Sequence, residues 1–395
     1  MIKDPYKELG VRKVVNAAGV LTRIGGSMSP PEVFQAMEIA SRNYVTISEL
    51  QTKAGEYFAD VTGAEAGLPT AGGSTSIMLA AAACIMKGTE LEKYEPKGPA
   101  VWRDIAQRLP VRSEGLKTEF IVQKCNRDEY DHAVECSGGR FKEVGTIDGA
   151  TEEELLAAYD PERTAAYYYT VKGFKGVPLE KIIEVAHRND VPVIIDACGR
   201  TPSNEKPNIY VAMGVDLICF SGGKSIRGPN NSGFLVGKRD LVKLAHLQSY
   251  PFEGVGRPAK MSRETIVGLV TALKIYLKTK NPNMFNELDK KSKELVDKLN
   301  TVQGINAGVD YVLDRSRKPS SPIVTVKVDK EQYGMTTKEL HLALVDGDSS
   351  ISIVTVYEPY FILENYHGLF SINTMFLAEG EDQQIISEIQ KHQRI

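Results

Sequence analysis

The sequence predicts an α/β fold in which a mostly parallel, doubly wound sheet is joined to a smaller C-terminal α/β domain. Helical and extended segments alternate through about residue 250, which is typical of a parallel sheet with crossover helices. The chain of 395 residues exceeds the usual size of one domain. We therefore expect residues 1–260 to form a large ligand-binding domain that includes the N-terminal segment. Residues 261–395 are expected to form a linker helix and a small C-terminal domain.

Strands of the large domain are expected at 119–124, 164–170, 191–197, 215–220 and 233–236. Residues 262–280 place apolar side chains on one helical face and predict the long linker helix. In the small domain we expect strands at 322–328, 351–356 and 369–373 and helices at 337–345 and 381–392.

Capping patterns predict where two helices begin. Ser48 to Gln51 and Thr151 to Glu154 both match the Ser/Thr-x-x-Glu/Gln capping box. Gly63 is expected to end the first of these helices, because glycine adopts the left-handed conformation common after a helix.

Composition excludes several classes of function. The formal charge of −3 offers no basic surface for nucleic acid. No apolar run reaches the roughly 18 residues of a membrane span, and Met1 to Tyr6 lack the features of a signal peptide. The five cysteines form no Cys-x-x-Cys pair, which argues against a disulfide framework and a zinc site. We expect a cytoplasmic protein that binds neither nucleic acid, membrane nor metal.

Lys224 is the first candidate catalytic residue. It follows an apolar strand in a Ser-x-x-Lys turn that starts at Ser221 and is followed by Gly228. A lysine there can form a Schiff base with pyridoxal phosphate, while the serine holds the cofactor's phosphate. Taken alone, the pattern also fits a solvated loop lysine.

Asp196 ends the preceding apolar strand, 28 residues before Lys224 (224 − 196). A carboxylate in this position can pair with a protonated pyridine nitrogen and keep the ring an electron sink. An aspartate after a strand can also simply stabilise a turn. The two residues fit the ends of neighbouring strands in one parallel sheet.

A small-residue turn precedes an alanine-rich helical segment. It contains Gly72, Gly73, Ser74 and Thr75. Glycines let the backbone approach an anion, and free N–H groups at a helix start attract phosphate. The turn matches neither the dinucleotide Gly-x-Gly-x-x-Gly spacing nor a P-loop. A plain turn with a Ser/Thr cap is the alternative.

Together these three elements resemble fold-type I pyridoxal-phosphate enzymes. Segments 9–19 and 58–66 are similar to the catalytic core of bacterial selenocysteine synthases. Within that group the chain most resembles D-glucosaminate-6-phosphate ammonia-lyases, from about residue 6 to the C-terminus. The segments that carry this likeness are 108–110, 115–119, 130–133 and 256–260.

The resemblance implies a dehydrating ammonia-lyase. Lys224 would hold pyridoxal phosphate and act as general base, and Asp196 would keep the pyridine nitrogen protonated. The substrate would be a small amino acid or a 2-amino-3-hydroxy sugar acid such as D-glucosaminate 6-phosphate, giving a 2-oxo-3-deoxy acid and ammonia. A homodimer or an assembly of dimers is implied as well.

Three alternatives stay open. One is another pyridoxal-phosphate activity, such as a racemase, β-lyase or aminotransferase. A second is a scaffold that has lost its chemistry, which the joint presence of Lys224, Asp196 and Ser221 disfavours. The third is a transferase on aminoacyl-tRNA. It is disfavoured because the core begins almost at Met1, without the N-terminal domain with which selenocysteine synthases hold tRNA.

The resemblance also implies further site residues around the cofactor. His132 is the candidate to pack on one face of the pyridine ring or to assist the leaving hydroxyl, and it also fits an ordinary turn. Cys198 stands where such enzymes usually carry an alanine under the other face, and a packing role is expected. Arginine and lysine suit substrate carboxylate or phosphate. The candidates for substrate contacts are Asn16, Arg23, Arg227, Arg257 and Lys260.

The chain departs from its relatives at two places that bear on the substrate. Residues 351–356 contain no arginine, although small domains of this group often offer one there. Cys125 and Asn126 replace a Gly-His pair expected before Arg127. The substrate carboxylate is therefore expected to be bound differently, or the substrate differs.

Overall fold

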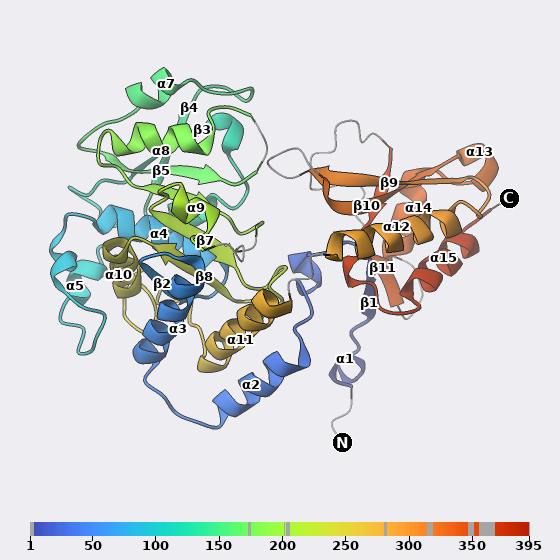
Figure 1. Ribbon diagram of the computed structural model, residues 1–395, viewed down its shortest axis with the longest axis horizontal. Helices are drawn as coiled ribbons and strands as arrows, with labels where there is room; N and C mark the ends of the chain where they lie inside the picture. The colour runs from blue at the N-terminus through green and yellow to red at the C-terminus, as the bar shows by residue number, and fades with distance from the viewer. Residues whose placement is uncertain are drawn as a thin grey trace. The chain divides into compact units, whose positions relative to one another are not determined.

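The computed structural model describes residues 4–172, 175–200, 202, 206–279, 283–313, 319–346, 351–354 and 368–394. The chain divides into two units, one of residues 28–279 and one that combines residues 1–27 with 280–395 (Figure 1). Helix α11 (Arg263–Thr279) belongs to the larger unit, and strand β1 (Lys13–Asn16) to the smaller. The domain division that we expected at residue 260 stays a prediction.

The larger unit is built on a seven-stranded sheet. Six strands are parallel, and β8 alone runs antiparallel to both of its neighbours. The order across the sheet is β2 (Ala66–Thr70), β8 (Gly233–Gly237), β7 (Leu217–Ser221), β6 (Val193–Asp196), β5 (Thr164–Thr170), β3 (Glu119–Gln123) and β4 (Arg140–Val144). This arrangement confirms the predicted mostly parallel α/β sheet.

Side chains of the central strands alternate between two apolar cores, because successive residues of a strand point to opposite faces. One face is covered by helices α4 (Gly73–Met86), α6 (His132–Cys136) and α10 (Arg239–Gln248). The other is covered by α3 (Ile47–Thr62), α7 (Glu152–Ala157), α8 (Leu179–His187), α9 (Ile209–Ala212) and α11. Helix α2 (Pro31–Ser41) packs on α11. Short turns complete the unit: η2 (Glu90–Lys93), α5 (Arg103–Ala106) and η3 (Lys124–Asn126).

One predicted capping box is confirmed and the other is wrong. Thr151 and Glu154 cap α7 reciprocally, and Gly63 ends α3 with a φ of 73°. Helix α3 instead begins at Ile47, before the expected cap. The Gln51 side chain turns inward and donates to the Tyr250 carbonyl at 2.7 Å. The Gln51 amide oxygen, which a capping box requires as an acceptor, lies 3.2 Å from Nε2 of His246 instead.

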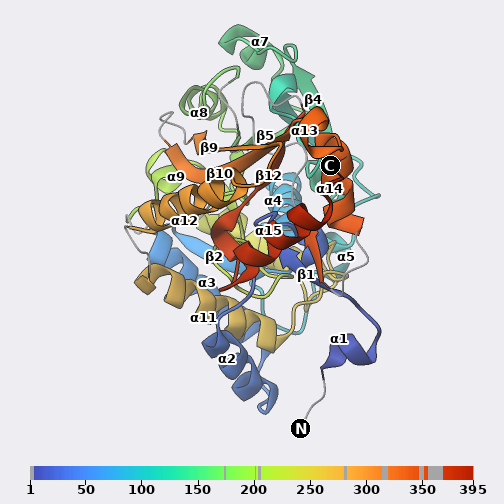
Figure 2. The same cartoon turned by 90° about the vertical axis from the view of Figure 1, so that its right-hand side faces the viewer.

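The smaller unit contains two short sheets. Strand β1 pairs in parallel with β11 (Ile351–Val354), and an antiparallel sheet has the order β12 (Phe370–Ile372), β10 (Pro319–Val328), β9 (Ile305–Leu313). Helix α12 (Met284–Leu299) packs on β9 and β10, as Figure 2 shows. The remaining elements are α1 (Pro5–Glu8), η1 (Thr22–Ile24), α13 (Lys330–Tyr333), α14 (Thr337–Asp346), η4 (Thr374–Phe376) and α15 (Glu381–Lys391). Of the strand expected at 351–356, the last two residues lie outside the described residues.

Helices long and apolar enough to cross a bilayer do not occur in the described parts of the chain. All five cysteines are free thiols.

Candidate active site

Side chains predicted for the site gather where the parallel strands end. Asp196 is the last residue of β6 and Ser221 the last of β7, and the two strands are parallel neighbours in which Asp196 pairs with Cys219. Lys224 follows β7 by three residues. The strand alternation turns Asp196 and Ser221 toward the sheet face that α4 covers. The carboxyl edge of an open parallel sheet is where such folds bind ligands.

The predicted phosphate turn lies at the start of α4 against these residues. Gly72 precedes the helix with a φ of 103°, and no side chain caps the first turn. A Cβ atom on Gly73 would lie 2.4 Å from Sγ of Cys198 and 3.6 Å from Cβ of Ser221. Only glycine allows this approach, so the turn, Cys198 and Ser221 border one small space. The first N–H groups of α4 remain open to an anion.

Ser74 and Thr75 continue the first turn of α4. Ser74 is exposed, and Oγ1 of Thr75 donates to the Ala71 carbonyl at 3.1 Å. Ser76, which we did not predict, is fully buried and its hydroxyl lies 2.6 Å from that of Thr70. This pair ties the helix start to the end of β2.

Asp196 is a buried carboxylate, with 7% of its surface exposed. Burial raises its pKa, while a 2.7 Å hydrogen bond from the Cys198 N–H and the positive charge of Lys224 oppose the rise. A carboxylate buried in this way is stabilised by a charged or donor group beside it.

Lys224 lies in a short loop after β7. The loop is closed by hydrogen bonds from the Gly228 N–H to the Gly222 carbonyl at 2.8 Å and from the Arg227 N–H to the Lys224 carbonyl at 2.9 Å. The Lys224 ammonium lies 5.9 Å from the centre of the Tyr130 ring and forms no ion pair with a carboxylate of the described chain. The lysine therefore lies beyond the carboxyl edge of the sheet, beside an aromatic ring.

These residues fit pyridoxal phosphate. The uncapped start of α4 and the Ser221 hydroxyl suit a phosphate, the buried Asp196 suits a protonated ring nitrogen, and Lys224 supplies an amine between them.

His132 is not brought into this group. It begins α6 with 76% of its side chain exposed, and Nδ1 lies 3.1 Å from Glu135. Tyr130, two residues earlier, is the aromatic side chain beside Lys224. From the sequence, Tyr130 could have been identified only as an aromatic residue in the same segment as His132.

Cys198 lies buried under the start of α4. Its thiol is 3.6 Å from the Cys219 carbonyl, and burial raises its pKa well above the ordinary value. The thiol therefore stays protonated and packs against Gly73.

Two of the predicted anion-binding residues share one aromatic ring. Arg257 and Lys260 lie 5.3 Å and 5.9 Å from the centre of the Tyr250 ring. Within the described chain neither has a carboxylate partner. Arg227, by contrast, has a left-handed backbone (φ 61°) and its Nε donates to the Met28 carbonyl at 2.8 Å.

Asn16 and Arg23 belong to the smaller unit. Asn16 stabilises a turn, donating to the Gly19 carbonyl at 2.8 Å and accepting from the Ala18 N–H at 3.0 Å. Arg23 lies exposed in η1. A role for either in substrate binding stays a prediction.

Asn126, one of the two residues that replace the expected Gly-His pair, is buried. Its side-chain amide donates to the Thr170 carbonyl at 2.9 Å and accepts from the Thr170 N–H at 2.8 Å. Since β3 ends at Gln123, the Asn126 amide takes the place of a neighbouring strand beside the end of β5.

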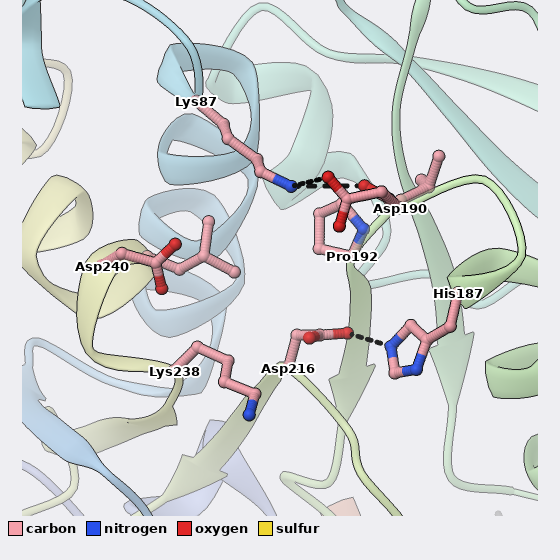
Figure 3. Close-up of a pocket in the computed structure, with 9 residues that line it drawn as sticks. Lys87, His187, Asp190, Pro192, Asp216, Lys238 and Asp240 are labelled. Carbon is pink, nitrogen blue, oxygen red and sulfur yellow. Dashed lines mark hydrogen bonds and ion pairs between the residues drawn. The ribbon is translucent and has the colours of Figure 1, made fainter.

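A polar cavity of about 200 Å³ lies at the opposite edge of the sheet (Figure 3). Asp216 precedes β7 and Lys238 follows the antiparallel β8, so this is the amino edge of the parallel strands. Asp216 accepts from His187 at 2.9 Å and from the Val193 N–H at 2.8 Å. These polar groups have partners within the protein and lie apart from the candidate site.

Comparison with known proteins identifies a matching family model, related sequences and a related structure. The family model for L-seryl-tRNA selenium transferase (SelA) matches residues 132–305. D-glucosaminate-6-phosphate ammonia lyase of Salmonella typhimurium is 28% identical over 99% of this chain and 98% of its own length. The 5'-C-glycyluridine monooxygenase-decarboxylase of a Streptomyces species is 30% identical over 76% of this chain and 72% of its own. A solved structure of D-glucosaminate-6-phosphate ammonia-lyase superposes with a TM-score of 0.81 over 99% of this chain and 98% of that one, at 28% identity.

Proposed function

Because the chain is a pyridoxal-phosphate-dependent lyase of the SelA-like family, we propose that it releases ammonia from a 2-amino-3-hydroxy sugar acid. The comparisons confirm the resemblance, the fold-type I architecture and the cofactor that we inferred from the sequence. The substrate and the site roles are our proposal. The observation that carries it is the likeness to the ammonia lyase over nearly the whole of both chains.

Pyridoxal phosphate, when bound, acts as an electron sink for the carbon that bears the amino group. Lys224 would hold the cofactor through Nζ and then accept the proton from that carbon. Asp196 would keep a proton on the ring nitrogen by accepting a hydrogen bond from it. The N–H groups of Gly73 to Thr75 and the Ser221 hydroxyl would hold the phosphate.

Tyr130 is favoured over His132 as the aromatic contact beside the reacting atoms, because its ring lies next to the Lys224 ammonium. His132 is largely exposed and already paired with Glu135. In the net reaction the substrate loses its 3-hydroxyl as water, water replaces the amino group, and a 2-oxo-3-deoxy acid and ammonia result.

Arg257 and Lys260 are proposed to bind the substrate's anionic groups. Two cations on one tyrosine ring, without a described carboxylate partner, favour an incoming anion. Their loss should raise KM more for a phosphorylated sugar acid than for the same acid without phosphate, and should leave kcat nearly unchanged.

A homodimer or an assembly of dimers in the cytoplasm is part of the proposal. Helix α2 and the residues after it expose Phe34, Ile39 and Tyr44, each with more than half of its surface accessible. Large exposed apolar side chains within one short segment favour an interface with another chain. Sedimentation at micromolar concentration tests the assembly, and a monomer there would contradict it.

The deciding experiment supplies the protein loaded with pyridoxal phosphate with D-glucosaminate 6-phosphate and, separately, with D-glucosaminate. Equal amounts of ammonia and 2-oxo acid are expected from wild type and none from Lys224→Ala. Exchange of the α-hydrogen without ammonia would instead indicate a racemase or an aminotransferase. Binding of seryl-tRNA would instead support the hypothesis of a transferase on aminoacyl-tRNA.

A further inference from the structure

Two neighbouring buried hydroxyl groups near Asp196 have no hydrogen-bond partner outside their own pair in the described structure. They belong to Thr170 and Tyr168, both on β5. The Tyr168 ring is 1% exposed, and its hydroxyl lies near that of Thr170 and within reach of the charge of Asp196. Buried polar groups in native proteins are nearly always hydrogen-bonded, so two such groups in one place call for a physical reason.

The sheet register brings Thr170 next to Asp196. The two residues are direct partners between β5 and β6, and they lie on the same face, which α4 covers. Adjacent strands are about 4.8 Å apart, so a threonine hydroxyl and a carboxylate at paired positions reach hydrogen-bonding distance by side-chain rotation alone. Thr170 is therefore the hydroxyl best placed to donate to Asp196.

The backbone of Thr170 is fixed on both sides. Asn126 holds its N–H and its carbonyl at 2.8 Å and 2.9 Å, and the next residue, Val171, donates to the Asp196 carbonyl at 2.9 Å. A hydroxyl on so constrained a backbone serves well as a positioning group, because little freedom is left to lose when it forms a bond.

Asp196 has a need that such a donor would meet. Its carboxylate is 93% buried, and the Cys198 N–H donates to one of its oxygens. An ionised carboxylate in an apolar surrounding is stabilised by each further donor. Thr170 lies on the same face of the sheet as Asp196, so the protein itself can supply this second donor.

We propose that Thr170 is a positioning residue that donates a hydrogen bond to Asp196 in the cofactor-bound protein, and that Tyr168 donates in turn to Thr170. The proposal rests on the proposed place of Asp196 at the ring nitrogen of pyridoxal phosphate. Thr170 thereby keeps the carboxylate ionised and aimed at the ring, and no contact between Thr170 and the substrate is involved.

The test measures the Kd of pyridoxal phosphate for the apoprotein by following the visible absorption of the bound cofactor. Thr170→Val removes the hydroxyl and keeps the shape, and a Kd about tenfold higher is expected from the loss of a hydrogen bond to a charged group. Thr170→Ser retains the hydroxyl and should lie within about twofold of wild type. Tyr168→Phe should raise the Kd by about threefold.

A double-mutant cycle separates positioning from mere packing. If Thr170 acts through Asp196, Thr170→Val has no further effect on the Kd in an Asp196→Ala background. Thr164→Val is the matched control, since Thr164 is buried on the same face of β5 and accepts from the Asp160 N–H at 3.0 Å, far from the site. It should lower the melting temperature and leave the Kd unchanged.

The proposal is overturned if Thr170→Val binds the cofactor as wild type does, or if Thr170→Ser binds no better than Thr170→Val. Persistence of the Thr170→Val effect without Asp196 overturns it too, as does an Asp196→Ala variant with unchanged Kd. The measurement needs no amino sugar acid. A wrong substrate in the proposed function therefore leaves this test intact.

Discussion

Asn126→Ala should markedly lower the stability of the larger unit. The substitution removes two hydrogen bonds of 2.8 Å and 2.9 Å at a residue that is 4% exposed. It leaves the N–H of Thr170 buried without a partner, while the Thr170 carbonyl keeps a 2.8 Å hydrogen bond from the Lys172 N–H. At about 1–3 kcal/mol for the orphaned N–H and about 1 kcal/mol for the lost bond to the carbonyl, the loss amounts to about 3 kcal/mol. For a unit of this size that corresponds to a melting temperature lower by about 6–12 °C.

The chain supplies its own control in Asn300. This residue makes the same pair of bonds, donating to the Ala307 carbonyl at 3.1 Å and accepting from the Ala307 N–H at 2.8 Å, but its side chain is exposed. Water replaces the amide there, so Asn300→Ala should cost only about 1 kcal/mol.

Hydrogen exchange of the apoprotein gives the local readout, and calorimetry gives the global one. Peptides that cover 164–171 should exchange faster in Asn126→Ala and at the wild-type rate in Asn300→Ala. Equal losses of stability in the two variants would refute the reasoning, because burial would then have no bearing on the cost.

Two further predictions follow from the same structure. Gly73→Ala should weaken pyridoxal-phosphate binding by about tenfold or more, because the new Cβ would meet Sγ of Cys198 at 2.4 Å. Adding Cys198→Ala should restore part of the affinity, and a double variant no better than the single one would refute the clash. Burial lowers the pKa of His246 to about 4, so its neutral form stabilises the fold above the unfolded pKa of about 6.5, and this stability is lost as the pH falls toward 4. Unfolding free energy should drop by about 2 kcal/mol between pH 8 and pH 5, and His246→Gln should show the smaller slope. Parallel pH profiles for wild type and His246→Gln would contradict that assignment.

Local sequence signals predicted the elements that carry the chemistry. The apolar segments before Asp196 and Ser221 are strands, and the glycine turn before α4 is the uncapped helix start that a phosphate needs. Each of these features depends on about ten neighbouring residues, whose length, glycine content and polarity directly determine the local backbone conformation.

Features that depend on distant pairing could not be predicted in this way. Asn126 and Thr170 are 44 residues apart. They make contact because β3 ends at Gln123 and leaves the end of β5 without a neighbouring strand on that side. Strand β4 escaped prediction because its residues Arg140, Lys142 and Glu143 are charged, as is common for a strand at the sheet edge. The predicted Ser48 capping box is wrong because both ends of the Gln51 amide form tertiary hydrogen bonds, with the Tyr250 carbonyl and with His246.

The pairing of β1 with β11 gives the two units different histories during synthesis. Residues 28–279 are contiguous, so the larger unit can complete its sheet while the rest of the chain is still being made. Strand β1 leaves the ribosome before residues 28–279, yet its partner begins only at Ile351. Strand β1 therefore stays unpaired while more than three hundred further residues are translated. Its Val15 side chain packs in a core that is completed only when the C-terminal segment has been made.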